Sequence, residues 1–96
     1  MDVYQKRRVN ALVNKVALDT RTVSCLALAG SMISDQTDLP VSVDGVIEEI
    51  ALYMDEFSMT GVDQLTDGNV GGIKAFGGQE KFCRYISSRY LGSIRT

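Results

Sequence analysis

The sequence predicts one compact all-α domain of three to four helices with one glycine-rich irregular segment, assembled as a homodimer. Two observations predict this fold class. Apolar residues recur at helical spacing in three separate stretches, and glycines concentrate between the last two. The 96 residues, 45% hydrophobic and 23% charged, fit a single domain over 1–96. A domain of this size buries only about 60–65% of its unfolded surface, so we expect oligomerisation to supplement the core.

The first predicted helix is defined by four apolar residues at i, i+3, i+4, i+7 spacing: Val9, Leu12, Val13 and Val16. Apolar residues continue to residue 33 and occupy two faces over 23–33, which predicts that this stretch is the centre of the core. An unbroken helix over 4–33 would be about 45 Å long, whereas a compact chain of this size has a radius of gyration of about 12–13 Å. Either the helix breaks within 19–22, with Thr20 or Thr22 as a new N-cap, or a second subunit covers its far end. We favour the break.

A second helix is predicted after a polar loop that contains the only proline. Ser42 is placed to cap it, and Val41 and Val46 are placed as the two halves of a hydrophobic staple. Asp44 lies in the first turn, where a negative charge suits the helix dipole. The helix has one apolar face, formed by Val46, Ile47, Ile50, Tyr53, Met54 and Phe57. We expect Gly61 to end it.

The glycine-rich segment Gly71–Gly78 separates this helix from the last one. Paired glycines bracket residues 73–76, for which we expect a short extended piece. The segment has the length of a phosphate loop but lacks the required Gly-Lys-Ser/Thr, so we interpret it as a mobile connector. The last helix is predicted over 79–91, followed by Gly92. Its apolar face is formed by Phe82, Cys83, Ile86 and Tyr90.

Charge is segregated along the chain. Residues 22–73 contain nine Asp and Glu and no Lys or Arg, whereas 1–21 carry a balance of +3 and 74–96 a balance of +4. Such segregation sets the surface potential and therefore the choice of partner. On the second helix, acids surround Leu52 on the face opposite Ile50, which we interpret as an apolar anchor with a polar rim. The predicted partner-binding residues are Asp44, Glu48, Glu49, Leu52, Asp55 and Glu56.

The two basic ends of the chain form an alternative surface, suited to nucleic acid or another anion. Its candidate residues are Lys6, Arg7, Arg8, Lys74, Lys81 and Arg84. The aromatic platforms or docking helix that nucleic-acid modules carry are not recognisable here. We therefore favour a simpler interpretation, in which these cations neutralise the acidic middle within one chain or across a dimer.

The sequence predicts neither a catalytic site nor a metal site, and it implies no cofactor. The chain has no His, which removes the Ser-His-Asp and Cys-His arrangements and the imidazole base. Cys25 and Cys83 lack CxxC spacing, so we expect buried reduced thiols. Because the chain also lacks a continuous apolar segment of signal or membrane-span length, we expect a cytoplasmic protein with no membrane partner.

The favoured function is that of a small non-enzymatic regulatory or inhibitory protein that binds another protein with a basic surface. Short chains without catalytic motifs are typical of stoichiometric binders that viruses or mobile elements direct against host machinery, and we extend this to the present chain by analogy. The alternative is a nucleic-acid-binding regulator that uses the basic ends. Its affinity would fall steeply with salt concentration.

Overall fold

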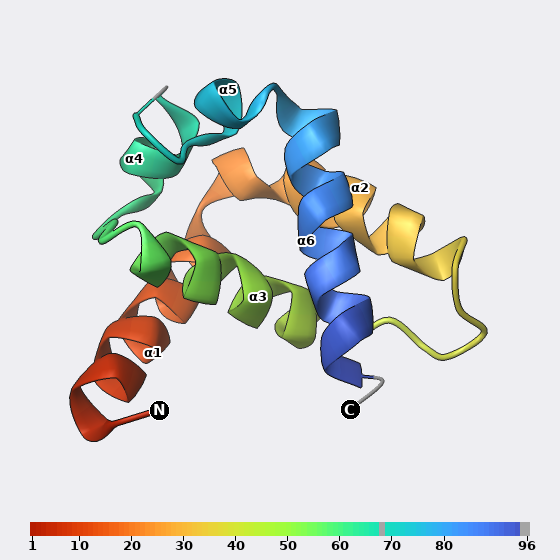
Figure 1. The fold of residues 1–96 in the computed structure, drawn as a ribbon, viewed down its shortest axis with the longest axis horizontal. Coiled ribbons are helices and arrows are strands. Elements are labelled where there is room, and N and C mark those ends of the chain that lie inside the picture. The colour runs from red at the N-terminus through yellow and green to blue at the C-terminus, as the bar shows by residue number, and fades with distance from the viewer. Residues whose placement is uncertain (68, 95–96) are drawn as a thin grey trace.

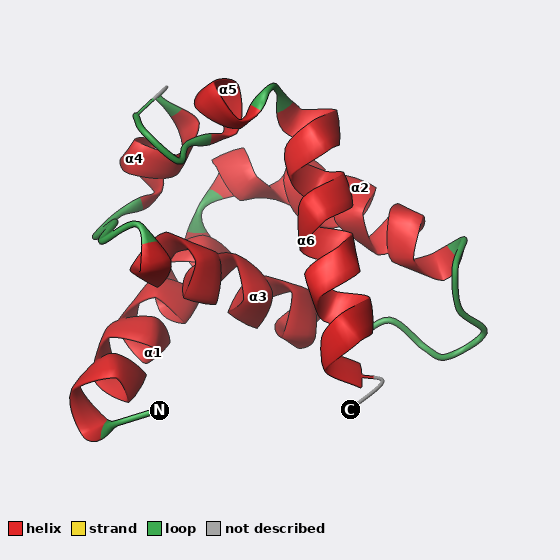
Figure 2. Cartoon of the chain, in the orientation of Figure 1, coloured by secondary structure: helices red, strands yellow, loops and turns green. Residues whose placement is uncertain are grey.

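The computed structural model describes residues 1–67 and 69–94, and within these residues every regular element is a helix (Figures 1 and 2). Its elements are α1 (Val3–Leu18), a 3₁₀ turn (Thr20–Thr22), α2 (Val23–Ser34), α3 (Val43–Glu56), α4 (Val62–Thr66), α5 (Ile73–Phe76) and α6 (Gln79–Ile94). The molecule measures 33 × 30 × 20 Å, with a radius of gyration of 12.6 Å. The predicted compact all-α class is confirmed. The short helices α4 and α5 were not predicted, and the homodimer stays a prediction.

Helix α3 lies at the centre of the fold. α1 crosses it, while α6 and α2 pack against its other sides and against each other (Figure 1). The prediction that residues 23–33 form the centre of the core is therefore wrong. In α2 only Cys25, Ala29 and Ile33 are buried, and Val23 is 60% exposed. Helical spacing shows which side chains share a face, but it does not show how many neighbouring helices cover that face.

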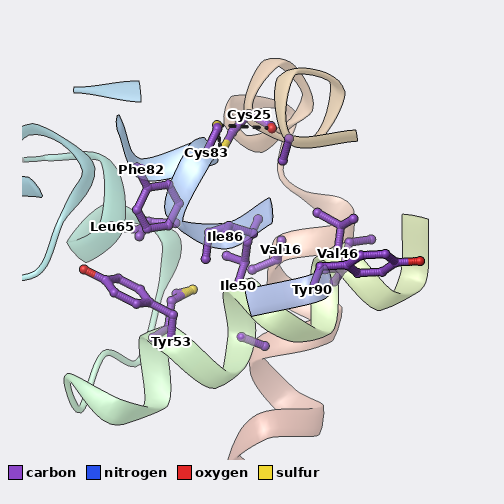
Figure 3. Close-up of a cluster of buried hydrophobic side chains, with 14 of the residues drawn as sticks. Val16, Cys25, Val46, Ile50, Tyr53, Leu65, Phe82, Cys83, Ile86 and Tyr90 are labelled. Carbon is purple, nitrogen blue, oxygen red and sulfur yellow. Dashed lines mark hydrogen bonds between the residues drawn. The ribbon is translucent and has the colours of Figure 1, made fainter. Parts of the chain in front are cut away.

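Buried side chains of α1, α3 and α6 meet in the core. Val16, Ile50 and Ile86 point toward one another there, and Phe82 packs edge-on against Tyr53 with ring centroids 5.1 Å apart (Figure 3). The predicted apolar face of α6 is confirmed, since all four of its residues are buried. On α3 the predicted face is buried as far as Met54, whereas Phe57 is half-exposed at the end of the helix.

The favoured break in the first apolar stretch is confirmed, because α1 and the segment Thr20–Ser34 are bent by 82°. Of the two predicted caps, Thr22 occupies the N-cap position of α2, although its side chain makes no capping hydrogen bond. Asp19 caps the 3₁₀ turn before it, and its carboxylate accepts from the backbone N–H of Arg21 at 2.9 Å. Thr22 is buried, and its hydroxyl lies 2.8 Å from the Val16 carbonyl oxygen and 2.7 Å from that of Asp19. Its hydroxyl therefore satisfies carbonyls at the end of α1, since buried polar groups require partners.

Helix α3 begins as predicted but ends earlier. The Ser42 hydroxyl accepts from the Gly45 backbone N–H at 3.1 Å, which confirms the N-cap. The helix ends at Glu56, two residues before Ser58, which has a left-handed φ of 57°. Gly61, predicted to end α3, instead precedes the first turn of α4.

Residues 73–76 form one helical turn, α5, and the predicted extended piece is wrong. The Phe76 N–H donates to the Gly72 carbonyl at 2.9 Å, which closes the turn between the two glycine pairs. Gly71 has a φ of +81°, and a Cβ there would lie 2.5 Å from the Phe57 ring, so only glycine fits. The prediction for Gly92 is also wrong, because α6 continues through it to Ile94.

A candidate docking groove beside the α1–α3 crossing

Helices α1 and α6 flank the acidic face of α3 and divide it into two edges. The edge toward α1 carries Asp44, Glu48 and Asp55, and the edge toward α6 carries Glu49 and Glu56. Leu52 lies between the two edges, where it is partly buried and packs against the core. It is therefore not the exposed anchor that the sequence predicts. The sequence could not show this because the core that covers Leu52 is built from helices distant along the chain.

Arg89 of α6 neutralises the edge of α3 that faces it. Its guanidinium lies 3.3 Å from the Glu49 carboxylate and 2.6 Å from that of Glu56. The guanidinium carbon also lies 5.7 Å from the centre of the Tyr85 ring. The side chains of Arg89 and Glu49 are only 21% and 12% exposed, so solvent screens this pair less than an ordinary surface pair. Glu49 and Glu56 thus have a partner within the chain.

Asp55 also has a partner within the chain. The Arg8 Nε lies 2.9 Å from its carboxylate, and this hydrogen bond raises the pKa of Arg8. The Asp55 side chain is 9% exposed, whereas the Arg8 side chain is 58% exposed. On the same side of the crossing the Lys15 Nζ donates to the Thr60 carbonyl oxygen at 2.6 Å. On this side of the crossing, side chains of α1 therefore already bind the Asp55 carboxylate and the Thr60 carbonyl.

On the opposite side of the crossing, α1 and α3 leave an open groove of about 450 Å³. It is lined by Asp44 and Glu48 from α3 and by five residues of α1 and the segment before it: Met1, Lys6, Val9, Asn10 and Val13. Within residues 1–67 and 69–94, Asp44, Glu48 and Lys6 form no ion pair. The groove therefore combines an apolar floor formed by Met1, Val9 and Val13 with two unpaired carboxylates on α3 and the unpaired Lys6 ammonium on α1.

The groove combines residues that the sequence assigned to different roles. Asp44 and Glu48 were predicted to bind a partner and Lys6 to contact an anion, and the fold brings the three to one site. Val9 and Val13 belong to the apolar face predicted for the first helix, and the structure places Val9 in the core and Val13 against it. Both also line the groove, which helical spacing alone does not reveal. The sequence does not show that these valines and Asp44 line one groove, because the groove is formed by segments more than 30 residues apart.

The six predicted basic residues form two clusters at opposite ends of the molecule (Figure 1). Lys6, Arg7 and Arg8 lie near the start of α1, whereas Lys74, Lys81 and Arg84 lie on α5 and the first half of α6. Arg8 pairs with Asp55, and Arg84 pairs with Glu80 at 2.9 Å. Only two cations in each cluster are left without an ion pair in the described part of the chain, which is little positive charge for a nucleic-acid surface.

Comparison with known proteins finds no family model, no curated protein and no solved structure that matches this chain. In the residues that the structure describes, no group of three or more His, Cys, Asp or Glu side chains is arranged to hold a metal ion. Over the same residues no single helix is both long and apolar enough to cross a membrane. Taken together, α1 and the segment Thr20–Ser34 are long and apolar enough, but the two are bent by 82° relative to each other.

Proposed function

We propose that this protein is a small non-enzymatic regulator or inhibitor that binds a basic amphipathic helix of another protein in the α1–α3 groove. One observation carries the proposal: an apolar floor lies beside two carboxylates that have no cationic partner within the described chain. Recognition of an amphipathic helix in a groove needs such an apolar surface for anchoring side chains. Charges at the rim then select the partner and its orientation.

The spacing of the two carboxylates specifies the partner more closely. Asp44 and Glu48 are four residues apart on one helix, so they are neighbours on its surface, about 5–6 Å apart at Cβ. Two Lys or Arg at i and i+4 on a partner helix have the same spacing and can face both acids. Lys6 on the opposite wall disfavours cations on the other flank of that helix. The expected partner therefore has apolar anchors, basic residues on one flank and neutral or acidic residues on the other.

A pair of synthetic helical peptides tests the proposal directly. Each peptide has about 18 residues and a leucine face; one carries arginines on a single flank, and the other carries glutamates at the same positions. We expect the arginine peptide to bind and to shift the NMR signals of Val9, Val13 and Glu48, and the glutamate peptide not to bind. Binding of neither peptide, or shifts confined to another surface, would contradict the proposal.

Matched charge reversals separate the groove from the overall charge of the protein. The test variant is Asp44→Lys with Glu48→Lys, and the control is Asp35→Lys with Asp38→Lys, which makes the same change of charge at exposed loop positions. We expect the test variant to weaken binding of the arginine peptide at least about tenfold and the control to change it about twofold or less. Equal losses in the two variants would show that net charge and not the groove attracts the peptide.

A further inference from the structure

The two cysteines of the chain lie against each other in the core, although 58 residues separate them in sequence (Figure 3). The Sγ atoms of Cys25 in α2 and Cys83 in α6 are 3.1 Å apart, and the residues are 3% and 0% exposed. The Cys83 thiol also lies 3.4 Å from the Cys25 carbonyl oxygen, to which it can donate. Both are free thiols, as predicted from the sequence. The fold therefore brings two thiols that are distant in sequence into direct contact.

We propose that Cys25 and Cys83 are a site of oxidative modification, at which an intrachain disulfide links α2 to α6. An S–S bond is about 2.05 Å long, so the two sulfurs need to approach by only about 1 Å. Helices α2 and α6 already pack along each other, and Cys25 and Cys83 both point into that contact. Rotation of the thiols and a small shift of the helices are therefore sufficient, without rearrangement of the fold.

A small oxidant such as hydrogen peroxide supplies a balanced route to the bond. The thiolate of one cysteine attacks one peroxide oxygen, which gives a sulfenic acid and releases hydroxide, and this hydroxide takes up the proton that the thiol lost and becomes water. The sulfur of the other cysteine then attacks the sulfenic sulfur, forms the S–S bond and releases a second water. Two thiols and one peroxide thus give one disulfide and two waters.

Either cysteine can begin this route, because in the contact between the two sulfurs either atom can be the donor. The sulfur that accepts this hydrogen bond is stabilised as a thiolate and attacks the oxidant. Because both sulfurs are buried, the α2–α6 contact must open transiently for the oxidant to enter, and oxidation is slower than for an exposed thiol.

The cross-link closes a long loop that contains α3, α4 and α5. Such a link removes conformational freedom from the unfolded chain, and the effect grows with the length of the loop. We therefore expect the oxidised protein to melt about 10 °C or more above the reduced protein, and reduction to reverse the increase.

Peptide mapping of the oxidised full chain tests the proposal. The folded protein is treated with hydrogen peroxide, denatured with an alkylating reagent to block remaining thiols, and digested with trypsin. Because residues 22–73 contain no Lys or Arg, Cys25 falls in the single peptide 22–74, whereas Cys83 falls in the short peptide 82–84. We expect these two peptides to be joined in non-reducing digests of the monomer and separated by dithiothreitol.

Other outcomes of the same digest overturn the proposal. Cys25 and Cys83 both alkylated after prolonged oxidation would show that the pair does not react, and higher oxidised forms of either cysteine without the joined peptides would show that it reacts separately. Joined peptides found only in covalent dimers would assign the link to two chains. A Cys25→Ala variant is the control, in which the joined peptides and the reversible rise in melting temperature must both be absent. The parent digest remains decisive if that variant does not fold.

Discussion

The two sides of the α1–α3 crossing contain the same types of residue but use their charges differently. On one side Arg8 pairs with Asp55, and Lys15 donates to a backbone carbonyl. On the other side Asp44 and Glu48 face an open groove without an ion pair in the described chain. Acidic residues on one helix can thus stabilise the fold at one end and be available to a partner at the other. The cations supplied by neighbouring helices decide between the two roles.

The segregated charges of the sequence meet in the folded chain. Several cations from the basic ends pair with acids of the middle segment: Arg8 with Asp55, Arg21 with Asp63, and Arg89 with Glu49 and Glu56. These contacts support the interpretation that the ends neutralise the middle within one chain. Asp44 and Glu48 are the acids of α3 that this neutralisation does not reach.

Removal of Arg89 should have the largest effect on stability. The variant Arg89→Leu leaves the Glu49 carboxylate, which is 12% exposed, without its cation. We expect unfolding free energy to fall by about 1–3 kcal/mol, the usual cost of stranding a shielded polar group. Urea denaturation followed by circular dichroism measures this loss. A second substitution, Glu49→Leu, should recover part of it, and an unchanged midpoint in the single variant would contradict the assigned role of the pair.

Replacement of Arg8 by methionine should have a smaller effect. The Arg8 side chain is 58% exposed, and its removal uncovers Asp55 to water, which restores much of the lost solvation. We expect a urea midpoint between those of the parent and Arg89→Leu. Because the Arg8 pair lies near solvent, its contribution should shrink in 1 M salt, where the Debye length is about 3 Å. A deficit that persists unchanged at high salt would indicate lost packing and not lost charge.

The part of the fold governed by local rules was predictable from the sequence. The Ser42 cap and the apolar face of α6 depend on residues close to each other in sequence, and the structure confirms both. The break within 19–22, also confirmed, followed from a second simple constraint, the length of an unbroken helix relative to the size of the domain. The turn of α5 was missed because paired glycines indicate a turn without specifying its type.

The candidate site was only partly predictable. Asp44 and Glu48 were identified as surface acids, but their separation from Glu49, Asp55 and Glu56 depends on where Arg8 and Arg89 lie in the fold. Those cations are more than 30 residues away in sequence from the acids they contact, and no local pattern indicates which acid each one contacts. The charge pattern therefore located the acidic helix along the chain, but it could not divide the surface of that helix into paired and unpaired acids.

Neutralisation of the unpaired acids Asp44 and Glu48 should change the free energy of unfolding less than either arginine substitution. The double variant Asp44→Asn, Glu48→Gln removes a like-charge pair at i, i+4, which destabilises a helix by about 0.2–0.5 kcal/mol. We expect the urea midpoint to stay level or rise slightly, although the change at Asp44 also removes a favourable charge from the first helical turn. A loss comparable to that of Arg89→Leu would show that these carboxylates serve the fold and not a partner.

The Asp19–Arg21 contact at the bend between α1 and α2 should make stability depend slightly on pH. Hydrogen bonds from the Arg21 side chain and then from its backbone N–H lower the pKa of Asp19 from 3.8 to about 2. Between these values the unfolded chain binds more protons than the folded chain, so the contribution of Asp19 is full above about pH 4 and is lost as the pH falls toward 2. In Asp19→Asn we expect the melting temperature to depend less steeply on pH in that window, relative to an Asp35→Asn control. Identical slopes in the two variants would show that the Asp19–Arg21 contact does not persist in solution.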